Sequence, residues 1–153
     1  MRTPAALFSV RSIRHTLVSV FTFASLAPLM SACMMFAKPP EHLDYSRTRV
    51  SEGGAYRATI LPAGDSIPKG RLHSWTLRIE TPSGAAVDSA TVMVDGGMPQ
   101  HGHGLPTKPR ARATGNGNYA VDGMKFNMGG WWVVKFRVQA GAGRDSLVFN
   151  VKL

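Results

Sequence analysis

Cysteine is almost absent from this sequence, and acidic residues are few. The 153 residues include a single cysteine, so no disulfide can form within the chain and any fold must rest on a hydrophobic core. Nine acidic residues stand against 18 basic ones. No stretch of ten or more residues keeps a helical period of apolar side chains, which indicates strands rather than helices.

The sequence also lacks the motifs of common enzyme classes. The run Gly141-Ala142-Gly143 has neither the third glycine nor the following helix of a dinucleotide-binding loop. Ser74 follows His73, but neighbouring residues of a strand point to opposite faces, so the two cannot form a catalytic pair. We assign the one thiol, on Cys33, to an anchor, and we expect the protein not to be an enzyme.

The first 32 residues have the order of a secretory signal. Residues 1–15 contain three arginines and no acid, residues 16–30 are almost wholly apolar, and small residues precede Cys33. The run Leu29-Met30-Ser31-Ala32-Cys33 resembles a bacterial lipobox, in which the cysteine is acylated and becomes the new amino terminus. We therefore expect a lipoprotein, anchored to a bacterial membrane and facing the periplasm. An uncleaved membrane helix and ordinary cleavage without a lipid are the alternatives.

The charge of the mature chain bears on its partners. Removing the three leader arginines from the net charge of +9 leaves +6. In an exported protein this excess favours the anionic membrane surface next to the anchor over nucleic acid. A soluble charged surface without a partner is the simpler interpretation, and it takes precedence over both. We expect membrane lipid, bound through Cys33, as a partner and no nucleic acid.

After the leader, the sequence divides into a linker at 33–50 and a domain at 51–153. The linker contains Pro39-Pro40 and no hydrophobic period. The domain alternates apolar and polar residues between turns, and Gly115-Asn116-Gly117 is a hairpin signal. We expect strands at 55–61, 71–80, 87–95, 111–114, 118–122, 131–138 and 145–153. About seven short strands indicate an all-β, antiparallel β-sandwich.

Two glycine-rich segments interrupt the alternation. Residues 96–109 are expected to be neither strand nor helix, and they contain Met98, His101 and His103. Residues 123–132 contain Met124 and Met128, which share one parity with Phe126 between them. The patterns GGMPQHGHGLPT and GNGNYAVDGMKFNMGGWW resemble the FixH/YtkA-like domains of bacterial exported proteins, which are sometimes labelled auxin-binding-like. The resemblance covers Gly54 to Leu153 and implies an immunoglobulin-like β-sandwich. It also implies a link with copper handling, which is associated with some relatives.

The histidines and methionines of these segments suggest a copper site. Thioethers favour Cu(I), and imidazoles bind either oxidation state. We expect His101, His103, Met98 and Met128 as ligands, with Cu(I) as the expected ion. Met124 and His73 are the further candidate ligands, which could complete the coordination of the ion.

Other interpretations remain open for the same residues. Methionines beside aromatic rings often fill a core. The glycines can serve only backbone conformation, and the loop can pack against the domain or contact a periplasmic protein. The sequence thus predicts a non-catalytic binding module, or else a structural or interaction domain without a metal.

Overall fold

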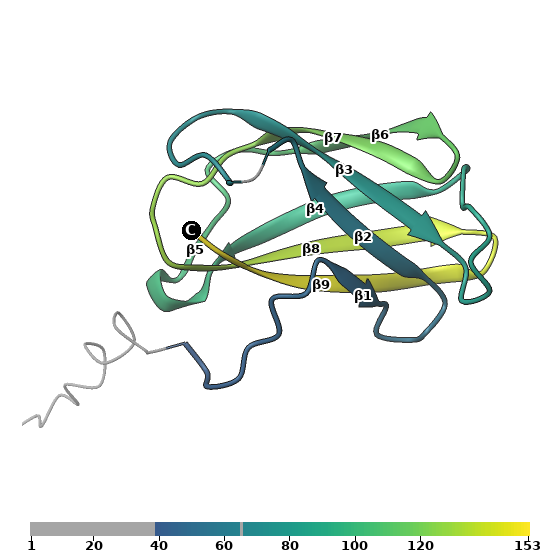
Figure 1. The fold of residues 1–153 in the computed structure, drawn as a ribbon, viewed down its shortest axis with the longest axis horizontal. Coiled ribbons are helices and arrows are strands. Elements are labelled where there is room, and N and C mark those ends of the chain that lie inside the picture. Colours follow the sequence, from purple (N-terminus) through teal and green to yellow (C-terminus); the bar gives the residue numbers. More distant parts are fainter. Residues whose placement is uncertain (1–38, 65) are drawn as a thin grey trace, which may run out of the picture.

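A computed structural model describes residues 39–64 and 66–153, which form an all-β domain (Figure 1). The predicted leader and lipid anchor, residues 1–32 and Cys33, lie outside the described residues. The elements are β1 (Thr48–Val50), β2 (Arg57–Pro62), β3 (His73–Glu80), β4 (Thr91–Met98), the 3-10 turn η1 (Pro99–His101), β5 (His103–Gly104), β6 (Arg110–Gly115), β7 (Asn118–Met124), β8 (Trp131–Ala140) and β9 (Gly143–Lys152). Within the described ranges, no helix is long and apolar enough to cross a membrane.

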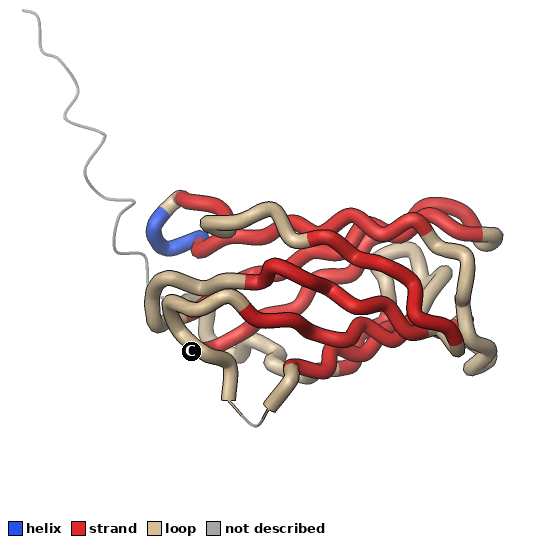
Figure 2. The backbone as a smooth tube through the Cα atoms, turned by 90° about the horizontal axis from the view of Figure 1, so that it is seen from above, coloured by secondary structure: helices blue, strands red, loops and turns tan. Residues whose placement is uncertain are grey.

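The strands form one antiparallel sheet in the order β1-β2-β3-β7-β6-β4-β8-β9, with β5 paired to β4. The sheet curls so that β2 and β3 lie across β4, β8 and β9 (Figures 1 and 2). A single ladder pair, Met93 with Arg110, joins β4 to β6 in the described chain. The predicted all-β antiparallel class is confirmed, and the strands are joined into one nearly closed, barrel-like sheet.

The alternation read from the sequence sets which side chains form the core. On β3, Trp75, Leu77 and Ile79 are buried, while the residues between them are half-buried. Every second residue of β8 and β9 is buried as well, from Trp132 to Val138 and from Leu147 to Val151, and Leu153, which follows β9, is half-buried. The fully buried hydrophobic side chains all lie between Tyr56 and Val151. A chain that begins at residue 39 therefore keeps the whole core described here.

The predicted hairpin at Gly115-Asn116-Gly117 is present between β6 and β7. Gly115 pairs with Asn118, which leaves Asn116 and Gly117 as a two-residue turn. Both turn residues have positive φ, 54° and 73°, as a type I′ turn requires. Asp88 accepts a hydrogen bond from Gly117 N at 2.6 Å, so the turn is also held by a neighbouring loop.

The prediction that 96–109 is neither strand nor helix was wrong for its first half. Strand β4 continues through Gly96 and Gly97 and pairs with β8, and η1 and β5 follow. The two glycines allow the close approach that this pairing needs. A Cβ atom on Gly96 would lie 2.4 Å from Val133 O, and one on Gly97 would lie 2.5 Å from His103 O. Glycine here marks tight strand contacts, where the sequence suggested a loop.

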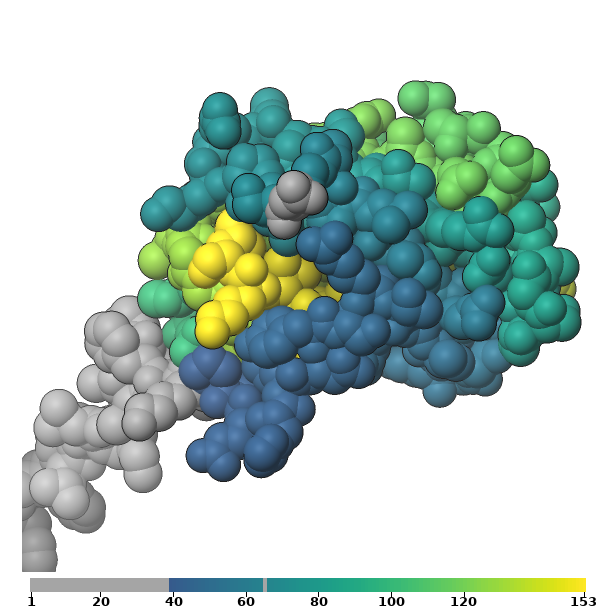
Figure 3. Space-filling model, viewed as in Figure 1, coloured from purple at the N-terminus to yellow at the C-terminus, as the bar shows by residue number. Residues whose placement is uncertain are grey.

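The end of the expected linker belongs to the sheet. Residues 48–50 form β1 on the edge of β2, and Asp44 O accepts a hydrogen bond from Asn150 Nδ2 at 2.9 Å. Glu52 N donates a hydrogen bond to Ser146 O at 2.8 Å. The two edges of the sheet, β1 and β9, therefore approach each other, although no continuous ladder joins them. Figure 3 shows the last residues of the chain at the surface, bordered by the segment that carries β1 and β2.

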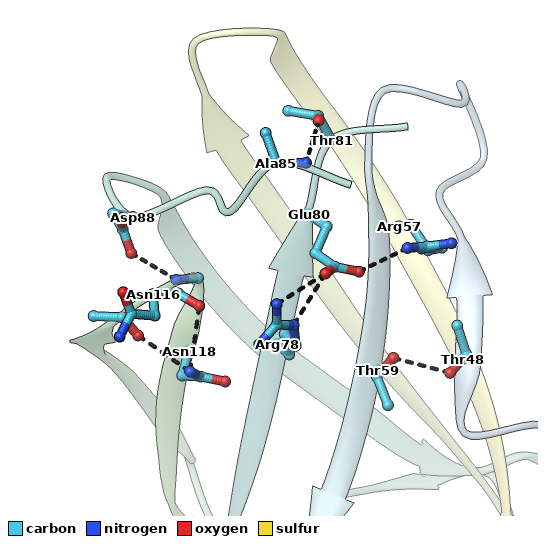
Figure 4. A network of polar contacts seen from close by, with 12 residues as sticks. Thr48, Arg57, Thr59, Arg78, Glu80, Thr81, Ala85, Asp88, Asn116 and Asn118 are labelled. Atoms are coloured by element: carbon cyan, nitrogen blue, oxygen red, sulfur yellow. Dashed lines mark hydrogen bonds and ion pairs between the residues drawn. The ribbon is translucent and has the colours of Figure 1, made fainter. Parts of the chain in front are cut away.

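A polar network lies at the end of the domain away from the carboxyl terminus (Figure 4). Glu80 accepts hydrogen bonds from Arg57 and Arg78, at 3.0 and 3.1 Å. These two guanidinium groups lower the pKa of the Glu80 carboxyl. Because the side chains of both arginines are largely open to solvent, the two ion pairs contribute little to stability.

Candidate functional site

The histidines and methionines singled out by the sequence gather at the end of the domain that holds the carboxyl terminus. This end contains η1 and β5, the start of β3, and the loop from Met124 to Trp131 (Figures 1 and 2). Gly102 ends η1 with a positive φ of 65°, which turns the chain back so that His103 pairs with Met98. His101 and His103 therefore lie on the two sides of one tight turn.

His103 is half-buried, and its two ring nitrogens have different surroundings. Nδ1 lies 3.1 Å from Gly104 O, and a carbonyl can only accept, so Nδ1 carries the proton of this hydrogen bond. Nε2 is buried and has no hydrogen-bond partner in the described part of the chain. In the neutral ring Nε2 is then a free acceptor. A backbone carbonyl that fixes the other nitrogen is the usual support of a metal-binding histidine.

His101 is exposed, and its ring centre lies 5.9 Å from that of His103. A ring nitrogen lies about 2.0 to 2.1 Å from a bound metal, so two rings that share an ion have centres about 4.5 to 6.4 Å apart. The observed separation falls within this range. The two imidazoles can therefore serve one ion once their nitrogens turn towards it. Because Nε2 of His103 is covered, that turn requires the residues around Gly102 to move.

His73 repeats the arrangement of His103 at the start of β3. Its Nδ1 lies 3.1 Å from Arg71 O, and its Nε2 is buried without a partner among the described residues. Aromatic rings stand between the two histidines. His103 contacts Trp132 at 5.4 Å between ring centres, Trp132 contacts Phe126 at 5.2 Å, and Phe126 contacts His73 at 5.7 Å. The structure therefore does not bring His73 into one coordination sphere with His101 and His103.

The predicted thioether ligands divide into buried and exposed ones. Met98 is 2% exposed and Met124 is 0% exposed, and both belong to the hydrophobic core. Met128 is 37% exposed, and its backbone carbonyl accepts a hydrogen bond from Trp132 Nε1 at 3.1 Å. Of the three methionines, Met128 alone offers its side chain to the surface at this end.

The sequence alone does not reveal the aromatic cluster between the histidines, which consists of Trp75, Phe126 and Trp132. The indole Nε1 of Trp75 is buried and finds no acceptor among residues 39–64 and 66–153. The sequence indicates that Trp75 on β3 and Trp132 on β8 point inward, but these strands are not neighbours in the sheet. Their meeting at Phe126 depends on how the sheet curls.

Acidic ligands do not converge at this end. Within the described ranges, no group of three or more His, Cys, Asp or Glu side chains is arranged to hold a metal ion. The hollow beside His103 is lined by Asp95, Gly97, Pro99 and Lys135, among others. Asp95 is the one carboxylate of this lining, so an ion beside His103 would draw most of its side-chain donors from imidazole and thioether groups, which suits copper better than magnesium or calcium.

Comparisons with known proteins place the middle of the chain in a family. Residues 56–137 match the YtkA-like family. A search of curated proteins finds no match. Among solved structures, the chain is similar to the "ZirS C-terminal Domain", with 12% identity, a TM-score of 0.37, and coverage of 95% of this chain and 97% of that one.

Proposed function

This chain belongs to the YtkA-like family, and from that premise we propose that its domain is a non-catalytic binding module outside the cytoplasmic membrane. The lipobox-like run that ends in Cys33 supports an anchored, periplasm-facing location. The first described residues lie at the end of the domain that carries His101 and His103 (Figure 1). An anchor before residue 39 would hold that end towards the membrane.

The order of the strands supports an immunoglobulin-like sandwich as the finer description of the fold. In that fold, strands A, B, E and D form one sheet, and C, F and G form the other. Strands β2, β3, β7 and β6 follow the first order, and β4, β8 and β9 follow the second. The single pair between Met93 and Arg110 then joins two facing sheets.

The ligand that we propose is a copper ion, held by His101 and His103. One observation carries this proposal: Nδ1 of His103 is committed to Gly104 O, while Nε2 is left without a partner among the described residues, beside a second imidazole. Met128 is the thioether that can reach the surface there. Met98 and Met124 are dropped from the ligand set because their sulfurs lie in the core, and His73 because aromatic rings separate it.

A structural role for the same loop is the second candidate. The edge of the His103 ring packs on Trp132, at 5.4 Å between centres, and the core encloses Met98. In this case the loop closes the end of the barrel or contacts a protein partner, and no metal binds.

Absence of catalysis is part of the proposal. The Ser74 hydroxyl donates to Asp122 Oδ1 at 2.7 Å, while the ring of His73 faces Phe126. Ser74 directs its proton to Asp122 and not to His73, so these residues do not form the serine–imidazole pair that activates a nucleophile.

Copper titration separates the two candidates. Residues 39–153 are titrated with Cu(I) and Cu(II) in competition with a chelator, alongside His101→Ala, His103→Ala and Met128→Leu. Both histidine variants should weaken binding at least tenfold, and Met128→Leu should weaken Cu(I) more than Cu(II). His42→Ala, which removes an exposed histidine of the segment before β1, outside the turn that holds His101 and His103, serves as the control. Weak binding that none of these changes affects, together with a destabilised His103→Ala, would favour the structural role.

A further inference from the structure

Two loops at the carboxyl-terminal end of the domain lie side by side. Lys69 forms an isolated bridge with Phe126, and Gly70 N donates a hydrogen bond to Phe126 O at 2.7 Å. These contacts fix residues 69–72 against residues 125–128. The loops together present a surface that we call the end patch, made of Lys69, Arg71, Leu72, Lys125 and Met128.

The end patch is basic. Thr107 Oγ1 donates to Gly123 O at 2.6 Å, which brings the segment with Lys108 to the border of the patch. Described residues 66–73, 97–109 and 123–131 contain no acidic side chain. On the strands, Asp122 is the acidic residue next to these ranges, and its carboxylate accepts a hydrogen bond from the Ser74 hydroxyl at 2.7 Å. Glu52, Glu80, Asp88 and Asp145 belong to the opposite end of the domain.

The patch also exposes apolar side chains between its cations. Leu72 is 66% exposed, which is the largest exposed fraction among the large hydrophobic side chains, and it follows Arg71 directly. Met128 is 37% exposed on the adjoining loop. Exposed apolar side chains flanked by cations match the chemistry of an anionic bilayer surface, where the cations meet phosphate groups and the apolar groups enter the interface.

The path of the chain points to the same occupant. The described chain begins at residue 39 at this end of the domain (Figure 1), and the apolar run 16–30 precedes it by only a few residues. A segment of that length keeps the end patch within reach of any bilayer that holds the run or a lipid on Cys33.

We propose that the end patch docks on an anionic lipid surface and orients the domain with η1 and the 125–130 loop towards the membrane. The inference deepens the anchored location proposed above and does not depend on copper. Electrostatic attraction supplies most of the binding, so the interaction weakens as salt rises. Leu72 supplies an apolar contact that salt does not screen.

Vesicle binding of residues 39–153 tests the docking without the anchor. Binding is measured by co-sedimentation, without copper, with phosphatidylcholine vesicles and with vesicles containing about one third phosphatidylglycerol. The wild type should bind the anionic vesicles only. Lys69→Gln/Lys125→Gln should weaken binding at least tenfold, since each cation near an anionic surface contributes about fivefold. Leu72→Ser should weaken it about tenfold and leave a salt dependence as steep as that of the wild type.

The matched control removes the same charge elsewhere. The two arginines of Arg112→Gln/Arg144→Gln are exposed on β6 and β9, and this variant should change binding less than threefold. Equal losses in this control and in the patch variant would overturn the proposal, because binding would follow net charge alone. Absence of binding to anionic vesicles would also overturn it, and retention of the chain on poly-glutamate beads in that case would indicate an acidic protein partner. Failure of the copper titration leaves the vesicle result intact, so the two proposals fail separately.

Discussion

Asp145 joins the start of the domain to the β8–β9 hairpin, and its replacement by asparagine is the most informative test of how the sheet closes. Its carboxylate accepts hydrogen bonds from Gly53 N at 2.9 Å and from Ala55 N at 3.1 Å, across more than 85 residues of sequence. Asp145→Asn keeps the shape of the side chain. It removes the charge and turns an NH2 group towards backbone donors.

The loss of unfolding free energy expected for Asp145→Asn follows from the lowered pKa of this carboxyl. The Ser51 hydroxyl and the N–H groups of Gly53, Ser146 and Ala55 lower the pKa of Asp145 from 3.8 to about 2. At about 1.4 kcal/mol for each tenfold change in the acid constant, this corresponds to at most about 2.5 kcal/mol. Solvent reaches the group, so screening reduces the contribution to about 1 kcal/mol. Loss of hydrogen-bond geometry in the asparagine variant brings the total to about 1 to 2 kcal/mol.

The sign of the pH dependence is fixed by the same values. The folded pKa lies below the unfolded one, so the contribution is present in full above the unfolded value of 3.8. It is lost as the pH falls through 3.8 towards about 2. The difference between wild type and Asp145→Asn should therefore shrink as the solution is acidified.

Urea unfolding followed by tryptophan fluorescence measures this difference at neutral pH and at about pH 2.5. Asp95→Asn is the control, because Asp95 faces Arg137 at 3.6 Å with both side chains exposed. It should change the free energy of unfolding by less than about 0.5 kcal/mol at neutral pH. An equal loss in the two variants, or a difference for Asp145→Asn that persists unchanged in acid, would refute the account.

Three further changes test the core and the tight contacts. Met124→Leu should cost less than about 1.5 kcal/mol in urea unfolding and leave copper affinity unchanged, because the sulfur is buried; weaker copper binding would restore Met124 as a ligand. Gly97→Ala should destabilise the domain by about 1 to 3 kcal/mol, since its Cβ meets His103 O, and a neutral effect in thermal unfolding would mean that the pairing of β4 with β5 relaxes easily. Tyr119→Phe should cost about 1 kcal/mol through loss of the 2.7 Å hydrogen bond to Val87 O, and unchanged unfolding would show that water replaces it.

The fold could be predicted from the sequence where alternation and turn residues agree. Trp132 and Phe136 share one parity on β8, and both are fully buried. Asn116-Gly117 specifies its turn because few other residues accept positive φ at both positions. The continuation of β4 was not predictable in this way. A glycine that permits close strand contact and a glycine that marks a loop look identical without the partner strand.

The candidate site was only partly predictable for a related reason. The spacing of His101 and His103 placed them together, because a short turn cannot separate them. The depth of Met98 depends on a strand that the sequence analysis ended three residues too early. Parity did group Met124 with Phe126, which is also in the core. Sequence period gives the direction of a side chain within a strand, but burial at a strand end depends on what the next loop covers.

In the described chain, one residue pair, Met93 with Arg110, joins the two halves of the sheet between β4 and β6, and this affects which segments can vary in length. Residues 99–109 cross from one half of the sheet to the other, and in the described chain the short β5 pairing and the hydrogen bond from Leu105 N to Gly96 O tie them to β4. Insertions or deletions in this crossover leave the register of both halves unchanged, because each half is aligned by its own hairpins and neighbours. The segment that carries the two histidines is thus free to diverge in length and chemistry while the scaffold beneath it stays the same.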